Sequence, residues 1–240
     1  MGRFKLVQEP QYIETLLLGL YHQENVYTVM EENTGKIAFS IREESNICFR
    51  CTPLLHCPPS SRPYAAKIFN AQGGLVALID RPCQCSFLCI CRPYVDVKDP
   101  SNTPIGKVVN PCPPFVCCNM KCEVFNEQEM NEYDISVCVC NFHVCCECCA
   151  GPCQETAISI GTKPGMDYTQ LPTSLKKVWS GFGKECYSAA NEYVFEVPDT
   201  WNEGQWAKFL ASLQLFDMLF FEQMWQCWCI GNFHLQHYTC

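Results

Sequence analysis

The chain has 240 residues, a formal net charge of −8 at pH 7 and 22 cysteines. A chain of this length can bury a sizeable core without covalent cross-links, so its size alone does not call for disulfides. The acidic balance, without any long basic run, argues against nucleic acid as the main partner, because that affinity depends on clustered Lys and Arg.

The first 25 residues are predicted to be an N-terminal extension. Their apolar patch, Leu16 to Leu20, is too short for the core of a signal peptide, and there is no small-residue cleavage site. This favours a reducing, cytosolic setting, in which most thiols are free, metal-bound or acylated. Because an anionic leaflet repels an acidic chain, membrane attachment would need acyl chains, inserted apolar surface or a partner.

Residues 26 to 197 contain short strand-like runs separated by turn residues. With weaker runs near residues 94, 115, 122 and 175, the total is about twelve. So many short strands with no helical stretch between them predict an all-β sandwich or a closed barrel. The clearest runs cover residues 26–30, 36–41, 65–69, 75–80, 105–109, 133–139, 155–160 and 192–197.

A helix is predicted at residues 206–222. Twelve of the sixteen residues from Trp206 to Phe221 are apolar, too many for a helix that shows one face to water. Sixteen residues rise only about 24 Å, short of a hydrocarbon core of about 30 Å, and Asp217 would lie deep inside that core. The helix is therefore expected to be buried in protein, as the filling of a barrel, with residues 26–222 forming one domain. The tail, 223–240, is aromatic and rich in cysteine, which favours contacts with other protein subunits.

Several segments resemble the phospholipid scramblase family. They occur in order along most of residues 26 to 222, so the match is specific for the family. The matching segments are Ser61-Arg62-Pro63-Tyr64, Gly73-Gly74, Arg81-Pro82 with the cysteines that follow, 104–115, 176–198 and 215–222.

The resemblance implies a mainly β fold, a closed twelve-stranded tubby-like β-barrel around a hydrophobic C-terminal helix. It also implies calcium-stimulated, ATP-independent movement or binding of phospholipids at the cytosolic leaflet of the plasma membrane or of an organelle. Such a protein needs no covalent chemistry and is not an enzyme. The alternative is a non-enzymatic structural or adaptor subunit of a large intracellular assembly, which would use the barrel for protein contacts.

The cysteines of "CQCSFLCIC" are the first candidate site, and the resemblance implies that this segment is S-acylated. Two or more acyl chains hold a protein firmly on a membrane, which gives clustered thiols a physical purpose. Alternatively, the C-x-C spacing places small thiols on one face of a strand, in a core. The cluster consists of Cys83, Cys85, Cys89 and Cys91.

A calcium loop is the second candidate implied by the resemblance. The family loop has acids at its first, third and last positions, where an ungapped alignment places Ala189, Asn191 and Thr200. A methyl group cannot bind calcium, and fewer carboxylates weaken a calcium site. Glu196 and Asp199 could donate oxygens after a shift in register. The sequence therefore predicts weak calcium binding or none.

A zinc site is the third candidate. The segment "HVCCECC" has His143 where the resemblance implies cysteine, followed by Cys146, Cys148 and Cys149. Histidine and cysteine are both good zinc ligands, whereas histidine is a poor substitute for an acylated thiol. A second set with similar spacing, which also includes His56, could complete one tetrahedral site: Cys48, Cys51 and Cys57. Free buried or acylated thiols are the alternative.

Overall fold

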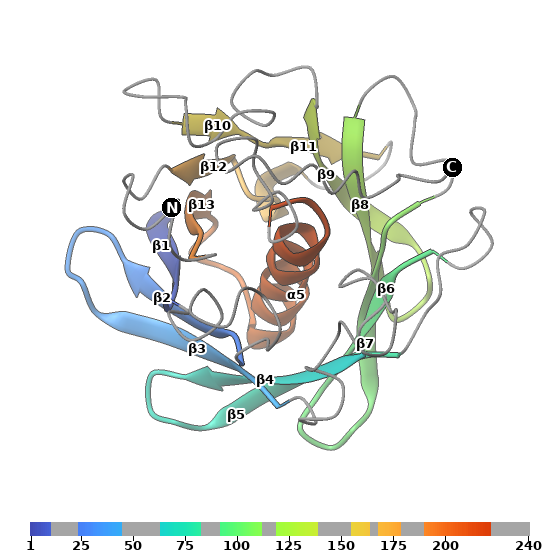
Figure 1. Cartoon of the computed structure of the whole chain (residues 1–240), viewed down its shortest axis with the longest axis horizontal. Coiled ribbons are helices and arrows are strands. Elements are labelled where there is room, and N and C mark those ends of the chain that lie inside the picture. Colours follow the sequence, from blue (N-terminus) through green and yellow to red (C-terminus); the bar gives the residue numbers. More distant parts are fainter. Residues whose placement is uncertain are drawn as a thin grey trace, which may run out of the picture.

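Inward and outward side chains alternate along the strands, as they do in a sheet with one face on a core. In β4 (Tyr64–Asn70) and β13 (Glu192–Val197), for example, every second residue is buried. The computed structural model describes residues 1–10, 24–44, 63–82, 92–111, 119–138, 155–163, 168–178 and 190–221. In these residues one antiparallel sheet curls around the helix α5 (Glu203–Phe220), which lies inside the ring of strands in Figure 1.

The sheet contains thirteen strands in the order β10-β12-β13-β1-β2-β3-β4-β5-β6-β7-β8-β9-β11. The remaining strands are β1 (Gly2–Gln8), β2 (Val26–Glu31), β3 (Ile37–Glu43), β5 (Leu75–Arg81), β6 (Tyr94–Lys98), β7 (Pro104–Val109), β8 (Asn119–Asn126), β9 (Asn131–Cys138), β10 (Glu155–Ala157), β11 (Ser159–Thr162) and β12 (Ser174–Val178), with a short 3₁₀ helix η4 (Tyr168–Gln170) before β12. The predicted fold class, a mainly β barrel around a C-terminal helix, is confirmed, and the described strands form a barrel that is nearly closed.

The segment 155–162 closes the barrel and accounts for the thirteenth strand. Its first three residues pair with β12 and its last four pair with β9, and Ile158 separates them. The predicted run over residues 155–160 is divided in the structure into β10 and β11. The weak run predicted near residue 115 lies outside the described residues, and β1 was not among the predicted runs.

Two predicted boundaries need correction. The N-terminal extension 1–25 contains a strand, because β1 pairs with both β13 and β2. The sequence signal for this strand was weak, because its inward residues do not stand out as apolar. Leu6 and Gln8 point inward, and Gln8 is polar, whereas Lys5 and Val7 point outward, and Val7 is apolar. The helix begins at Glu203, before the predicted Trp206, because capping and not apolar periodicity sets its start.

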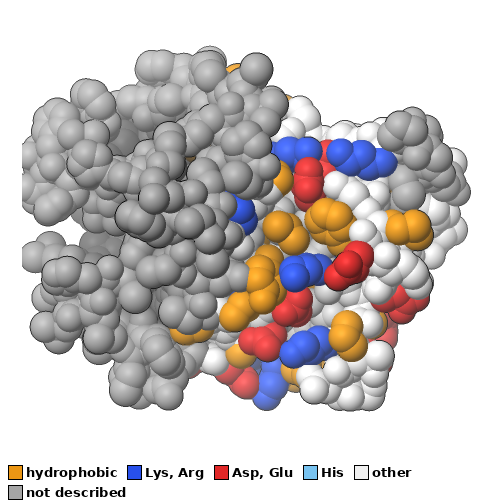
Figure 2. Space-filling model, turned by 90° about the vertical axis from the view of Figure 1, so that its right-hand side faces the viewer, with side chains coloured by type: hydrophobic (Ala, Val, Ile, Leu, Met, Phe, Trp, Pro, Cys, Tyr) orange, Lys and Arg blue, Asp and Glu red, His pale blue; other side chains and the backbone are white. Residues whose placement is uncertain are grey.

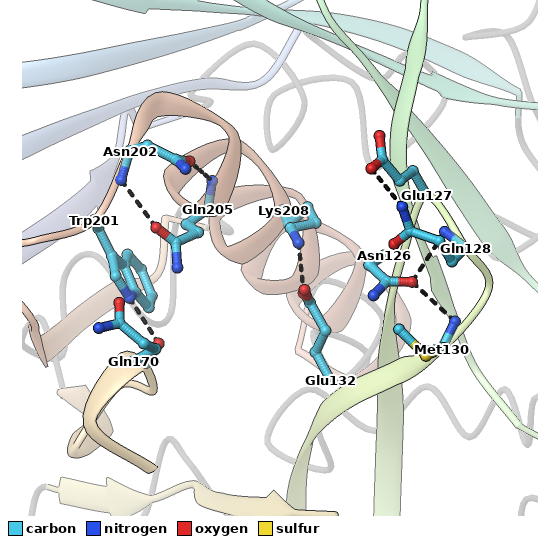
Figure 3. Close-up of polar contacts among 10 residues, drawn as sticks. All are labelled: Asn126, Glu127, Gln128, Met130, Glu132, Gln170, Trp201, Asn202, Gln205 and Lys208. Carbon is cyan, nitrogen blue, oxygen red and sulfur yellow. Dashed lines mark hydrogen bonds and ion pairs between the residues drawn. The ribbon is translucent and has the colours of Figure 1, made fainter. Parts of the chain in front are cut away.

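A capping box starts the helix (Figure 3). The side chain of Asn202 accepts a hydrogen bond from the backbone N–H of Gln205 at 2.9 Å, and the side chain of Gln205 accepts one from the backbone N–H of Asn202 at 3.0 Å. These two bonds satisfy backbone donors that would otherwise lack partners at a helix start. Every residue from Trp206 to Phe220 is buried, as the all-round apolar sequence predicts.

The helix packs tightly against one side of the barrel. A β-carbon at Gly106 of β7 would lie 2.6 Å from Cδ of Lys208 and 2.7 Å from the backbone oxygen of Phe125. The stem of Lys208 therefore needs a glycine opposite it, and its ammonium group forms an ion pair with Glu132 at 2.5 Å (Figure 3). No helix in the described part of the chain combines the length and the apolar character needed to cross a membrane.

Candidate functional site

The two ends of the barrel differ in their connections. At the end that we call the turn end, short turns join β2 to β3, β4 to β5, β6 to β7 and β8 to β9. The opposite end, the loop end, is formed by Gln8, Glu43, Arg81, Val109, Cys138 and Val178, which the strand register brings together. The segments that contain the predicted acylation and zinc residues follow these strand ends in the sequence.

A buried carboxylate lies inside the barrel at the loop end. Asp217 of α5 is fully buried and accepts hydrogen bonds from three side chains on the surrounding strands. Its Oδ1 accepts from the Tyr193 hydroxyl at 2.6 Å and from the Asn191 amide at 2.7 Å, and its Oδ2 accepts from the Tyr27 hydroxyl at 3.0 Å. These bonds fix the C-terminal half of the helix to β2 and to the start of β13.

The polar contacts continue from Asn191 towards the neighbouring strands. Gln8 accepts a hydrogen bond from the backbone N–H of Asn191 at 3.0 Å and donates one to the side chain of Asn25 at 2.8 Å. The backbone N–H of Asn25 in turn donates to the Glu43 carboxylate at 3.1 Å. We refer to these residues as the buried polar cluster: Gln8, Asn25, Tyr27, Glu43, Asn191, Tyr193 and Asp217, all of which are buried.

Two buried cations accompany the cluster. The Arg81 guanidinium lies 5.7 Å from the centre of the Tyr64 ring and contacts the sulfur of Met218 at 4.0 Å. The Lys177 ammonium lies 4.8 Å from the centre of the Phe221 ring. The loop end of the interior thus holds charges of both signs, and buried charges are tolerated only when they are paired and hydrogen-bonded.

Burial raises the pKa of the Asp217 carboxyl to about 6. The hydrogen bond from Tyr193, the charge of Lys177 and the hydrogen bonds from Tyr27 and Asn191 act in the opposite direction, because they favour the ionised carboxylate. Asp217 therefore changes its charge near neutral pH, unlike an exposed aspartate.

The cluster joins the helix to the barrel and is not arranged around an open cleft. Its members touch one another and are closed off from solvent, and the apolar side chains of α5 fill the rest of the interior. In the part of the chain that the structure describes, the helix and the buried polar cluster thus occupy the inside of the barrel.

The outer surface carries paired charges between strands. Figure 2 shows the face at the right of Figure 1, where Lys and Arg side chains lie close to Asp and Glu, with hydrophobic side chains between them. Among the pairs between β5, β6 and β7, Lys98 lies 3.2 Å from Asp80, and Lys107 lies 3.9 Å from Asp96. Exposed pairs of this kind contribute little to stability.

The four residues predicted as calcium ligands lie at two different ends of the barrel. Asn191 is in the buried polar cluster at the loop end, where its amide is bound to Asp217. Glu196 lies five residues further along β13, about 17 Å away in an extended strand. Asp199 and Thr200 follow it at the turn end, where Thr200 bonds to Gln170. These residues do not form one set of calcium ligands in the structure.

The predicted acylation residues Cys83, Cys85, Cys89 and Cys91 lie outside the described residues, as does every predicted zinc ligand, and so does the tail 223–240. Two cysteines are described, Cys122 and Cys138, and both are free thiols. Burial raises the pKa of the Cys122 thiol well above its usual range, so it is unreactive. Within the described ranges no group of three His, Cys, Asp or Glu side chains is placed to hold a metal ion.

The sequence interpretation missed most of the buried polar cluster. It noted Asp217 as a charge in an apolar helix but did not assign partners to it. A signal was present in Gln8, Tyr27, Asn191 and Tyr193, which are polar residues at inward positions of strands. Finding it would have required the register of strands far apart in the sequence.

Comparisons with known proteins all point to scramblases. The family model described as Scramblase matches residues 5–223. Phospholipid scramblase 1 of Rattus norvegicus is 26% identical over 216 residues, which are 89% of this chain and 58% of that protein. Phospholipid scramblase 2 of Homo sapiens is 26% identical over 226 residues, 93% of this chain and 69% of that protein. The chain thus spans about three fifths of the length of the first of these relatives.

Proposed function

Because this chain belongs to the scramblase family, we propose that it is a membrane-associated protein that binds phospholipids, or moves them between leaflets, without ATP or covalent chemistry. The match over residues 5–223 is the observation that carries the proposal, because it includes the barrel and its helix together. We place the protein on the cytosolic leaflet, which is the location that the family resemblance of the sequence implies.

The filled interior limits how lipid can move. The helix occupies the barrel along its whole described length, so a headgroup cannot pass through it. In the proposed mechanism the protein lowers the barrier for a polar headgroup to cross hydrocarbon by presenting outer surface or by thinning the bilayer locally. For the outer surface to form a continuous polar path across the bilayer, several copies of the chain would have to assemble.

Lipid exchange by the purified full chain tests the proposal. We expect vesicles that contain the protein and a fluorescent phosphatidylcholine to lose more fluorescence to an external quencher than protein-free vesicles do. The rate should rise steeply with the number of chains per vesicle, because several copies are required. Replacing a calcium chelator with calcium should change the rate by less than about twofold, since the predicted ligands lie at opposite ends of the barrel.

The outcomes of this experiment are distinct. A rate equal to that of protein-free vesicles, both with calcium and with chelator, would contradict the proposed lipid movement. A rate that rises many-fold with calcium would contradict the expectation that this chain binds calcium weakly or not at all.

The loop end is proposed to face the membrane. Its strand ends lead into the predicted acylation segment, since Arg81 of β5 directly precedes Pro82 and Cys83. Acyl chains attached there would hold this end of the barrel on the leaflet and compensate for the net charge of −8.

Removal of the four thiols should release the protein from membranes. Mass spectrometry of the cell-derived protein should find acyl groups on Cys83, Cys85, Cys89 and Cys91. Replacing all four with serine should lower the membrane-bound fraction about tenfold, because two or more chains are needed for stable anchoring. A matched variant with serine at Cys112, Cys117 and Cys118 should remain bound, and equal release of the two variants would contradict the assignment.

Metal analysis of the purified full chain tests the proposed zinc site. The candidate ligands are His143, Cys146, Cys148 and Cys149 in one group and Cys48, Cys51 and Cys57 in the other, and four of these seven would close a tetrahedral site. Metal analysis should find about one zinc per chain, as a closed structural site requires. His143→Ala should reduce that content, and wild-type protein free of zinc would contradict the site.

A further inference from the structure

The barrel wall has an interruption where β11 and β12 diverge. β10 pairs with β12, but the chain turns at Ile158 and β11 pairs with β9 instead. A shallow pocket of about 400 Å³ opens between the two segments. Its lining residues, which we call the β11 seam, are Ile158, Ser159, Ile160, Thr162, Leu171, Pro172, Thr173 and Ser174.

One edge of β11 points its backbone groups into the seam. The N–H of Ile158 donates to the oxygen of Leu175 at 2.9 Å, so the backbone groups of Ile158 face β12. Backbone groups alternate between the two sides of a strand, so those of Ile160 and Thr162 face the same side as those of Ile158, where β12 has diverged. Ser159 and Gly161 face the other way, opposite Ser136 and Asp134 of β9.

The opposite wall of the seam is fixed in place and does not pair with β11. Pro172 has no N–H, and the N–H of Thr173 donates to the oxygen of Glu196 at 3.0 Å. The oxygen of Gln170, just before this wall, accepts a hydrogen bond from the Trp201 indole at 2.8 Å (Figure 3). Neither Pro172 nor Thr173 therefore offers a backbone donor to β11.

The chemistry of the edge selects its ligand. Ile160 and Thr162 each present one donor and one acceptor, about 7 Å apart along the strand. A phosphate or a carboxylate would satisfy the donors alone, and no lining residue carries a charge to attract one. An extended peptide offers donors and acceptors at the same repeat. A second copy of this chain would have to bring a whole barrel wall into a groove with walls on both sides.

We propose that the β11 seam binds an extended peptide segment of a partner protein, which adds one strand to the edge of β11 that pairs with no other described strand. Four apolar and four hydroxyl side chains line the seam and none is charged, so the peptide presents small polar and apolar side chains and not charged ones. This inference is independent of the proposed lipid function, and it gives the chain a protein-binding surface away from the loop end.

Hydrogen exchange with a peptide probe tests the seam. A random library of displayed eight-residue peptides is selected against the full chain, and the strongest binders are synthesised. In the free protein the amides of Ile160 and Thr162 should exchange much faster than those of Ser159 and Gly161, which face β9. At least one selected peptide should slow exchange at Ile160 and Thr162 about tenfold or more, because it would supply the missing acceptors.

Two variants separate backbone pairing from other contacts. Ile160→Pro removes the N–H that faces the seam, together with a side chain that packs against the core, and should weaken binding of that peptide about tenfold, the equivalent of one lost hydrogen bond or more. Ile160→Val keeps the N–H and should bind like the wild type. Should the proline variant not fold, the exchange measurement on the wild type decides alone.

Four results would overturn the inference. The first is that no selected peptide protects Ile160 and Thr162, and the second is that a folded proline variant binds with unchanged affinity. Slow exchange of both amides in the free chain at all concentrations would show that the chain fills its own seam. Slow exchange that appears only as the protein concentration rises would assign the edge to a second copy.

Discussion

Replacing Asp217 with alanine should lower the free energy of unfolding by about 3–5 kcal/mol at pH 7, the usual cost of removing one partner from a buried charged contact. The Tyr193 and Tyr27 hydroxyls and the Asn191 amide would lose their shared acceptor in the core. Urea denaturation followed by circular dichroism measures the change. The exposed carboxylate of Glu203, in the first turn of the same helix, is the matched control, and Glu203→Ala should cost less than about 1 kcal/mol.

The same variant should show a characteristic dependence on pH. The folded pKa of Asp217 is raised from 3.8 to about 6, so the folded state binds a proton more readily than the unfolded state between these values. The stability that protonation contributes is fully present below pH 3.8 and is lost as the pH rises through 6, a difference of about 3 kcal/mol. The destabilisation by Asp217→Ala should therefore grow by most of this amount, about 2 kcal/mol, from pH 7 to pH 4.

Asp217→Asn keeps an acceptor for the tyrosine hydroxyls and provides a milder test. This variant should lower the free energy of unfolding by about 1–3 kcal/mol at pH 7. The new amide N–H₂ group is a donor, and it would face side chains that themselves donate to position 217. The difference from wild type should follow the same trend with pH. A difference that stays constant between pH 4 and pH 7 in both variants would show that Asp217 does not titrate in this range.

Trp206→Ala should have a similarly large effect, about 3–5 kcal/mol, because it leaves a cavity among aromatic rings. The Trp206 ring lies 4.9 Å from the ring centres of Phe4 and Phe39, and 5.6 Å from that of Trp201. It therefore joins the start of the helix to β1 and β3. Denaturation in urea, with near-ultraviolet circular dichroism as a second signal, measures both stability and packing.

An exposed residue provides the control for Trp206. Met130, in the turn between β8 and β9, has 58% of its surface exposed, and Met130→Ala should change stability by less than about 0.5 kcal/mol. Equal losses of unfolding free energy in the two variants would contradict the importance of Trp206 for packing the helix against the barrel. A loss of less than about 1 kcal/mol in Trp206→Ala would do the same.

The clear strands and the buried helix were predictable from the sequence because their signals are local. Val95 and Val97, or Tyr193 and Phe195, alternate with outward residues over a few positions, and that alternation is independent of the rest of the chain. The helix was recognisable because no face of residues 206–221 is polar. β1 was missed since an inward glutamine breaks its pattern, and the partners of the Gln8 side chain, Asn25 and Asn191, directly precede β2 and β13.

The candidate sites divide in the same way. The predicted acylation, zinc and calcium residues came from spacing and from the family resemblance, and none of them led to the buried polar cluster. Asn191 was named for calcium, yet in the structure its amide bonds to Asp217, twenty-six residues later in the chain. The sequence does not show which residue such a polar side chain contacts, because the contact depends on how distant segments pack.

The sequence by itself determined that this chain is a mainly β protein of the scramblase family with its last helix buried, because composition, periodicity and motifs act over short distances. Only the tertiary structure decided how the barrel closes at Ile158, which strands surround Asp217, and that one edge of β11 faces an open pocket. These features depend on the register between strands that are distant in the sequence, and register is set by the packing of the whole barrel around α5.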